Sequence, residues 1–519
     1  MATKKAKAKV GGAGQAGSKV RAKKGGGVPV ARKTARVKRE KVPVGSIVAW
    51  EDDPMSGGAP IVRPAPNLSA GSFAIRITTP APPVKEYKPG TSQFRYWTAA
   101  EALARAAGMW SVLVPATRWQ PGGVLPVVLD FGVDLNAYYD REGLKFFHAA
   151  AGGKIVYSGE SPDVLCHELG HAVLDSVRPD LWDANSDEVA AFHESFGDMS
   201  ALLSQLQLPS FRKTVLTETG GSLYRSSRLS RLAEQLGWAI RLGRPDAVDP
   251  DSLRNAVNSF FYRDPMLLAP SGPANVLTSE PHSFSRVFTA AFFEGLANML
   301  GSVDPTKGAS ADQLGQVAHD AGSLLVEGVR HAPLAASFYS KVAGAMVAAD
   351  AAGFGGKYAQ ALKSAFIRHG ILSLDSASSL TGPQAVGIAQ SFAASRTAAA
   401  PLAPVSMNLD GGRFGLAGRT LVCQVASHSQ TPAAARAITS AATPGFAAAA
   451  DAPAMVGYDH QAAESFVVDL FRRGRVSVGP LTTPETSIEH PMHHKTHQVV
   501  ERNGDLELLR IQFDCGFNG

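Results

Sequence analysis

The chain has 519 residues, of which 45% are hydrophobic and 18% charged, a composition typical of a globular protein large enough to bury a substantial core. Its three cysteines, an odd and low number, exclude a disulfide framework and favour a reducing compartment. No apolar run reaches membrane-spanning length, and no apolar signal-peptide region follows the basic N-terminus. We therefore expect no transmembrane segment and a cytoplasmic protein, with export by another route as the alternative.

The positive charge is concentrated at the start of the chain. Residues 1–41 contain 14 Lys and Arg and one acid, a net charge of +13; because the whole chain carries +6, the remainder carries −7. This stretch lacks aromatic residues and is rich in Gly and Ala, so we predict a disordered basic tail over residues 1–44. The tail could bind nucleic acid or another anionic surface through phosphate contacts, or it could be only a solubilising segment.

Residues 42–89 are rich in Pro and Gly, and the segments that follow have strand or helix patterns. Strands are predicted at Ser46–Trp50, Phe73–Thr79 and Val124–Phe131. The pair Thr98 and Glu101 has the spacing of a capping box and predicts a helix through Ala107. The segment Lys154–Ser158 is predicted to be an edge strand beside a cleft.

The motif that carries chemistry is His167-Glu168-Leu169-Gly170-His171, an HExxH sequence. On a helix, residues four apart lie on one face, so His167 and His171 could each direct a ring nitrogen at one zinc ion. Glu168 could then reach a water molecule beside that ion and act as general base. The alternative is an ordinary amphipathic helix that carries these residues by chance.

A catalytic zinc ion takes three protein ligands, and the segment EVAAFHESFGDMSALL predicts a second helix that could supply the third. Glu194 and Asp198 are four residues apart and share a face of that helix. Glu194 is the predicted third ligand, and Asp198 is the predicted carboxylate that accepts the other ring N–H of a ligating His. His193, next to Glu194, could compete as a ligand.

These residues carry a resemblance to a known family. HELGHAVLD followed by HESFGD resembles the thermolysin-type gluzincin metallopeptidases, as do Asn136-Ala137-Tyr138-Tyr139 upstream and His282 in PHSFSRVFTAAFF downstream. The matches are collinear from about Asn136 to Ile371. The resemblance implies a zinc-dependent endopeptidase that hydrolyses peptide bonds of a peptide or protein substrate through a zinc-activated water, with Glu168 as general base.

The resemblance also implies roles for residues outside the zinc motif. Asn136 and Ala137 would bind substrate, His282 would stabilise the oxyanion, and Arg254 stands at about the place of the substrate-binding Arg. The family's oxyanion Tyr appears here as Trp182, whose indole N–H could still donate. Calcium is not predicted, because no carboxylate lies between Asp198 and Glu218, where the family's calcium sites need them.

The fold class implied is α+β, with a thermolysin-like arrangement of two lobes. Residues 45–373 would form the metallopeptidase domain, with an α+β lobe over 45–180 and a helical lobe over 181–373. Within the second lobe, helices are predicted at Phe284–Leu300 and Ala311–Val329.

Beyond Ser373 the composition changes. Residues 374–456 are rich in Ala, Ser and Pro and are predicted to be a loosely structured connector with one strand at Thr420–Val425. Residues 457–519 are predicted to form a small β module of two hairpins. One pairs Phe466–Phe471 with Val476–Val478, and the other turns at Asn503-Gly504 between Gln498–Glu501 and Glu507–Phe513. Four His at positions 490, 493, 494 and 497 could bind a transition metal or belong to a surface loop.

A function of a different class also fits the sequence. The chain could be a catalytically inactive metallopeptidase fold that serves as a scaffold, tethered to an anionic partner by its basic tail. The presence of His167, Glu168, His171, Glu194 and His282 together favours the enzyme.

Overall fold

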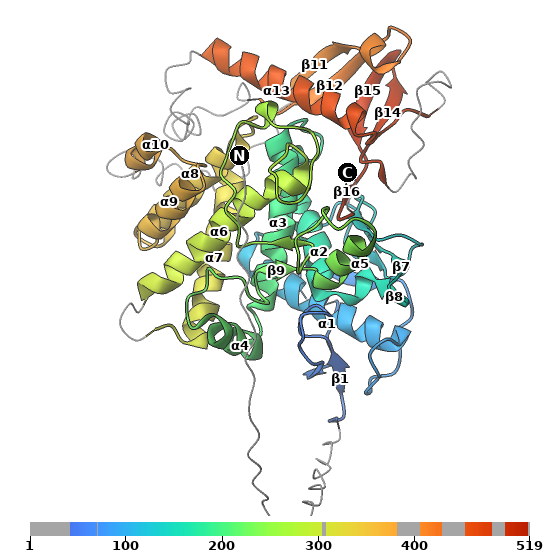
Figure 1. Ribbon diagram of the computed structural model, residues 1–519, viewed down its shortest axis with the longest axis vertical. Helices are drawn as coiled ribbons and strands as arrows, with labels where there is room; N and C mark the ends of the chain where they lie inside the picture. Colours follow the sequence, from blue (N-terminus) through green and yellow to red (C-terminus); the bar gives the residue numbers. More distant parts are fainter. Residues whose placement is uncertain are drawn as a thin grey trace, which may run out of the picture. The chain divides into compact units, whose positions relative to one another are not determined.

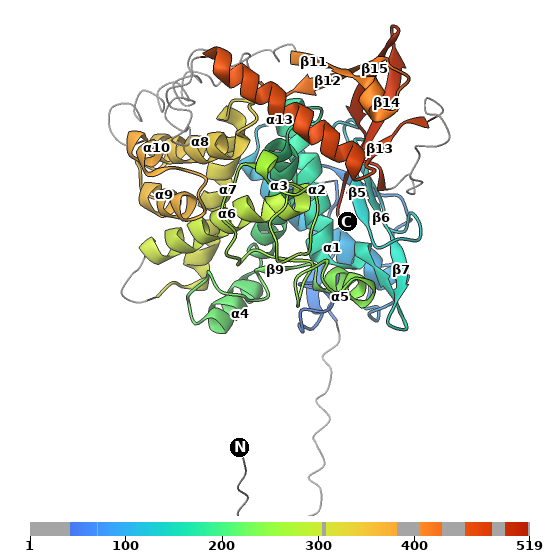
Figure 2. The same ribbon diagram turned by 45° about the horizontal axis from the view of Figure 1, so that its top comes forward.

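The computed structural model describes residues 42–69, 71–303, 308–380, 405–427, 452–479 and 494–516, and they form a mixed α+β protein (Figures 1 and 2). The predicted α+β class is confirmed. The basic tail up to Lys41 and most of the predicted connector lie outside the described residues, so their predicted disorder and loose structure stay untested. The strand predicted at Thr420–Val425 is confirmed. Within the described ranges, no helix has the length and apolar character needed to cross a membrane.

Helices dominate the region from Pro162 to Ser379 and include the two predicted at Phe284–Leu300 and Ala311–Val329. The α-helices are α1 Ser92–Leu113, α2 Pro162–Val177, α3 Asp187–Gln205, α4 Pro209–Thr219, α5 Glu234–Gly243, α6 Pro281–Val303, α7 Ala311–His331, α8 Phe338–Gly353, α9 Ala359–Arg368, α10 Leu374–Ser379 and α13 Ala452–Arg472. Short 3-10 turns occur at Ser158–Glu160, Pro179–Leu181, Pro265–Leu267 and Gly411–Phe414.

The strands form two five-stranded sheets and three small antiparallel pairs among the described residues. The first sheet has the order β16-β5-β6-β4-β3, with β3 Ile75–Ile77, β4 Leu125–Val128, β5 Ala137–Tyr139, β6 Leu144–Phe146 and β16 Phe513–Asp514. The second has the order β11-β12-β15-β14-β13, with β11 Val405–Asp410, β12 Thr420–Val425, β13 Val476–Ser477, β14 His497–Arg502 and β15 Asp505–Arg510. The pairs are β1 Ser46–Ala49 with β2 Ile61–Pro64, β7 His148–Ala151 with β8 Lys154–Tyr157, and β9 Arg231–Leu232 with β10 Arg254–Asn255.

The helix predicted to open at Thr98 begins earlier than expected. Helix α1 starts at Ser92, and the Thr91 side chain caps it by accepting a hydrogen bond from Phe94 N. Thr98 lies inside the helix, where its hydroxyl accepts from Trp50 N at 3.2 Å. The aromatic side chains between these positions are buried, and their packing extends the helix beyond the capping-box signal.

The C-terminal β module differs from the prediction at its first hairpin. Residues 466–471 are not a strand but the end of α13, and the sheet begins at Val405, so the module is not confined to residues 457–519. The reason is a helical spacing of apolar residues that the strand assignment overlooked: Ala463, Phe466, Val467 and Leu470 are all buried in the module's own core.

The second hairpin is confirmed. β14 and β15 pair antiparallel, and the turn places Asn503 at φ 52° and Gly504 at φ 92°, the left-handed conformations that a two-residue turn between strands favours. After β15 the chain leaves the module, and β16 lies away from β14 and β15 (Figure 1). β16 joins the first sheet beside β5, and the side chains of Phe513 and Cys515 are part of the main core. This crossing brings the end of the described chain to the HExxH helix.

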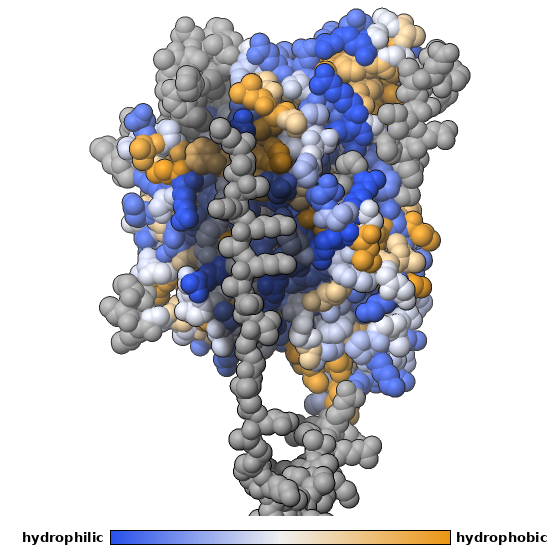
Figure 3. Space-filling view, viewed as in Figure 1, coloured by the Kyte–Doolittle hydropathy of each residue, from blue (hydrophilic) through white to orange (hydrophobic). Residues whose placement is uncertain are grey.

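On the face drawn in Figure 3, polar and apolar side chains alternate in small patches over the described residues. The candidate functional site lies in the interior, between α2 and α3.

Candidate metal centre

Two glycines allow α2 and α3 to approach each other closely at the HExxH motif. A Cβ atom built on Gly170 would lie 2.8 Å from the Ser200 side chain and 2.9 Å from the Gly197 backbone. A Cβ atom on Gly197 would lie 2.6 Å from the ring of His167. Any side chain at these two positions would force the helices apart, so the glycines set the depth at which His167 packs against α3.

The three predicted ligands converge in one place. His167 and His171 have their Nε2 atoms 3.1 Å apart, and the Glu194 carboxylate oxygens lie 3.3 Å from His167 Nε2 and 3.7 Å from His171 Nε2. Ligands of a tetrahedral zinc ion at about 2.0–2.1 Å from the metal are about 3.3–3.4 Å apart. All three side chains are buried, and their donor atoms form a group able to hold a metal ion.

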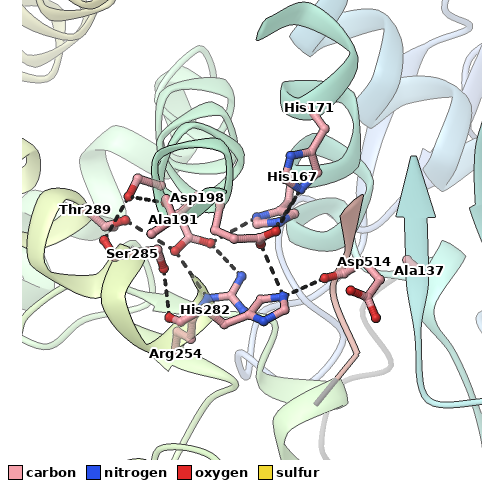
Figure 4. A network of polar contacts seen from close by, with 12 residues as sticks. Ala137, His167, His171, Ala191, Asp198, Arg254, His282, Ser285, Thr289 and Asp514 are labelled. Atoms are coloured by element: carbon pink, nitrogen blue, oxygen red, sulfur yellow. Dashed lines mark hydrogen bonds and ion pairs between the residues drawn. The ribbon is translucent and has the colours of Figure 1, made fainter. Parts of the chain in front are cut away.

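Asp198 lies behind His167 as predicted. Its Oδ1 is 3.0 Å from His167 Nδ1, which orients Nε2 toward the other ligands. The carboxylate also accepts from Arg254, at 2.8 Å from Nη2 and 3.3 Å from Nε (Figure 4). Although burial works in the opposite direction, Arg254 and His167 hold the pKa of Asp198 well below its ordinary value. Asp198 is therefore a buried anion with fixed partners.

Arg254 was predicted to bind substrate, and the structure gives it a different primary contact. Its guanidinium is buried against Asp198 from β10, which explains why this Arg is tolerated in the interior. The same side chain lines a cavity of about 50 Å³ next to Cys515 and Gly516. The contact with Asp198 makes Arg254 a support for the metal ligands; a direct contact with substrate stays a prediction.

Glu168 is buried beside the ligands without a fixed partner. It has no measurable exposure, and neither carboxylate oxygen accepts a hydrogen bond from the described residues. Burial raises its pKa to about 8, despite the opposing effects of His167 and the Cys515 thiol. A carboxylate buried at this cost without a partner is typical of a group that handles a proton of a bound molecule.

His282, at the start of α6, faces the ligands from the opposite side. Its Nδ1 is 2.7 Å from Glu280 Oε1, and its Nε2 lies 3.3 Å from Glu194 Oε2 and 2.5 Å from the carbonyl oxygen of Asp514 (Figure 4). Burial lowers the pKa of His282, but the carboxylates of Glu194 and Glu280 more than offset this and raise it to about 10. A cationic ring directed at a peptide carbonyl is suited to stabilising negative charge on that oxygen.

The predicted substrate-binding residues form an edge that is already paired. Asn136 is fully buried and precedes β5, and its Oδ1 accepts from Ala137 N at 2.8 Å. β16 pairs antiparallel with β5, opposing Asp514 to Tyr138, and Cys515 N donates to Ala137 O at 2.8 Å. β8, predicted as an edge strand beside the cleft, pairs only with β7 among the described strands and is therefore an edge strand, but β5 is the strand whose edge a peptide segment already occupies.

Two further predictions differ from the structure. His193 is not part of the ligand group; its ring stacks on Phe513 with centroids 4.0 Å apart. The indole N–H of Trp182 donates to the Arg510 carbonyl at 3.2 Å, so it is committed to the backbone and is not offered to an oxyanion. His193 also lies beside His171, with ring centroids 5.8 Å apart, and both His193 and Trp182 contact the ring of Phe513.

A second group able to hold a cation lies at the N-terminal end of α2. Asp52, Asp163 and Glu234 are buried with their carboxylate oxygens within 4.8 Å of one another. The prediction against calcium rested on the residues that follow Asp198, whereas these three carboxylates come from distant segments that only the fold assembles. The described members of the His cluster do not form a site: His494 contacts Asp134 at 3.4 Å, and His497 is buried beside Phe466.

Sequence reasoning missed the residues that enter the site from the other end of the chain. Phe513, Asp514 and Cys515 are more than 300 residues from the HExxH motif, and no spacing in the sequence connects them to it. Cys515 Sγ lies within 4.8 Å of a ligand atom of His167 and of Glu168. The only available signal was the β14–β15 hairpin, which indicates a strand near this segment but not its destination.

No protein-family model matches the chain, and a search of curated proteins finds no similar sequence. What the site does is therefore inferred from its geometry. That geometry consists of two His and one Glu as a ligand group, a buried carboxylate without a partner, a cationic His and a strand edge that pairs with a peptide.

Proposed function

We propose that this chain is a zinc-dependent metalloendopeptidase with a thermolysin-like arrangement of two lobes. The observation that carries the proposal is the convergence of His167, His171 and Glu194 on one point, with the unpartnered Glu168 carboxylate beside it. Two imidazoles and one carboxylate are a ligand set used by catalytic zinc in peptidases. When bound there, zinc would lower the pKa of a water molecule and polarise a peptide carbonyl.

The protein residues would bind and orient the peptide. An extended substrate would pair with the edge of β5, where Ala137 O accepts a peptide N–H, as it does now from Cys515. His282 Nε2 would donate to the carbonyl oxygen of the bond to be cleaved, at the position that the Asp514 carbonyl holds in the structure. These two contacts fix both sides of a single peptide bond.

Glu168 would move the protons of the reaction. Its carboxylate would take a proton from water and deliver it to the departing amine. A carboxylate with a pKa near that of the medium serves both steps, and burial moves the pKa of Glu168 in that direction. Asp198 would keep His167 in the orientation for metal binding, with Arg254 fixing Asp198 in turn.

The proposal is tested by measuring zinc content and cleavage of an unfolded protein substrate on the same preparations. Glu168→Gln should retain zinc and lose cleavage by about 100-fold or more. Glu142→Gln, the same substitution on an exposed side chain, should cleave like the wild type. Normal cleavage by Glu168→Gln would reject the assigned general base.

The ligand set has a matched pair of variants on adjacent positions. Glu194→Ala should lose zinc, while His193→Ala should keep it, because His193 lies outside the ligand group. Retention of zinc by Glu194→Ala would reject this ligand set. Zinc bound at full occupancy without cleavage by any form of the chain would favour the scaffold function instead.

A further inference from the structure

The segment Phe513–Gly516 occupies the groove where the proposed peptide substrate would bind. It leaves the second sheet after β15 and runs antiparallel along the β5 edge, with Asp514 opposite Tyr138. The Asp514 carbonyl meets His282, and the next N–H, from Cys515, meets Ala137 O. These are the two contacts expected for the carbonyl and the amine of a substrate bond, so the chain holds a peptide of its own in the position of a substrate.

The segment is held along its whole length. Phe513 is buried against the rings of His193 and His171, with centroid distances of 4.0 and 5.1 Å, and the Arg510 guanidinium lies 4.1 Å from its ring centre. The Asp514 carboxylate forms a buried ion pair with Arg475.

Gly516, at the end of the segment, is also closely packed. Gly516 packs against the Asn136 side chain so tightly that a Cβ atom on it would lie 2.7 Å from that amide. The cavity that remains beside Cys515 measures about 50 Å³, which holds a few water molecules but no second peptide strand.

The side chain that follows the Asp514 carbonyl is a thiol. Cys515 is 3% exposed, and its Sγ lies within 4.8 Å of a ligand atom of His167 and of the Glu168 carboxylate. It does not lie within that distance of His167, His171 and Glu194 together, so coordination of the same metal requires the thiol to move toward them. Thiolate sulfur is a strong zinc ligand, and a catalytic zinc site with three protein ligands keeps one position open. The Glu168 carboxylate lies beside this thiol, and no other side chain of the described residues is its hydrogen-bond partner.

We propose that Cys515 is a fourth protein ligand of the metal held by His167, His171 and Glu194, and that Phe513–Gly516 thereby closes the peptide groove from within the chain. The inference rests on the proposed metal site. It assigns the fourth position to a thiolate, whose proton is released when the metal binds. Substrate can enter only when the segment leaves β5, so the resting chain is held in an inhibited form.

The coordination is tested by the spectrum of the full chain reconstituted with Co²⁺ alone. Thiolate coordination gives a sulfur-to-cobalt charge-transfer absorption in the near ultraviolet, which does not depend on peptidase activity. We expect this band in the wild type and in Cys423→Ser, whose thiol is buried in the core of the β module. It should be absent from Cys515→Ser and Cys515→Ala. A spectrum that is the same in all four proteins would overturn the assignment.

The closure is tested by the rate of cleavage of an unfolded protein. Because only the open fraction of the enzyme binds substrate, Cys515→Ala should raise kcat/KM by about tenfold or more. A chain ending at Gln512 should gain at least as much, and Cys423→Ser should match the wild type. Equal rates in all these proteins would overturn the closure. Should the shortened chain unfold, Arg475→Gln, which removes only the ion pair to Asp514, gives the same test with a smaller gain.

Two outcomes separate this inference from the proposed function. A cobalt band that depends on Cys515, with no cleavage by any variant, would keep the fourth ligand and reject the peptidase. Cleavage lost in Glu168→Gln, with no band and no gain from Cys515→Ala, would keep the peptidase and reject the fourth ligand. The wild type and Glu168→Gln must also each have the intact mass calculated from their own sequences, because self-cleavage after Asp514 would make the segment a substrate rather than a ligand.

Discussion

Helices α2 and α3 hold two buried clusters of acidic side chains that differ in their counter-charges. In the metal centre, Asp198 on α3 is paired with Arg254 and His167, and its pKa is lowered. At the other cluster, Asp163 lies in the first turn of α2, one turn before His167, among Asp52, Asp53 and Glu234. Burial raises the pKa of Asp52 to about 7 and that of Asp53 to about 6.

The comparison shows that burial alone does not set the charge of a carboxylate. Both clusters are almost completely removed from water, but the partner of Asp198 is a guanidinium, whereas Gln205, a neutral amide, donates to both Asp52 and Asp163. An unpaired buried charge costs several kcal/mol, so a carboxyl without a cation takes up a proton instead. One cluster is thereby fixed as an anion, while the other holds protons near neutral pH.

The largest effect should come from removing the counter-charge of the metal centre. Arg254→Met leaves Asp198 buried without its guanidinium, which should lower the free energy of unfolding by about 3–5 kcal/mol, measured by denaturant titration. Arg368→Met is the control, because its side chain is 70% exposed and its ion pair with Glu294 should contribute only about 0–1 kcal/mol. Equal losses in the two variants would mean that Arg254 does not stabilise a buried anion.

A smaller effect should follow from a substitution at Gly197, where α3 packs against the His167 ring. Gly197→Ala would push the His167 ring away from α3, so we expect zinc affinity to fall by about 10–100-fold, measured by competition with a chromophoric chelator. Gly108→Ala in α1 meets nothing within 4 Å and should bind zinc like the wild type. Unchanged affinity in Gly197→Ala would show that His167 is not held by this close approach.

The smallest effect concerns the acidic cluster and depends on pH. Because its pKa is raised, Asp52 keeps a proton in the folded protein over a pH range in which the unfolded chain releases it. The contribution of this proton to stability is therefore complete below about pH 4 and is lost as the pH rises through about 7. Asp52→Asn removes this loss. In metal-free protein, the thermal midpoint of the variant, relative to wild type, should therefore rise between pH 5 and pH 8 by about 2–4 °C.

The outcome depends on the groups that surround Asp52. Besides the neighbouring acids, Arg228 and Arg105 lie near the cluster and act in the opposite direction on the pKa of Asp52 and Asp163. A constant difference in thermal midpoint from pH 5 to pH 8 would mean that these cations neutralise the cluster. The two clusters would then differ in composition but not in charge.

The prediction of the fold was most successful where the signal is local. The HExxH helix, the Glu194 helix and the Asn503-Gly504 hairpin each depend on residues within a few positions of one another. It failed at residues 466–471, where a short apolar run could be read as a strand, and where helical packing against the second sheet decides the structure. Short apolar runs carry no unambiguous period, which is why the sequence left this element open.

The sequence by itself determined the candidate metal ligands. His167, His171, Glu194 and Asp198 lie on helices at spacings of four residues, and helix geometry places them on common faces before any tertiary contact forms. Only the tertiary structure decided what surrounds them. Arg254, Asp514 and Cys515 reach the site through β10 and β16, whose partners are chosen by packing between distant segments, and no local periodicity records such contacts.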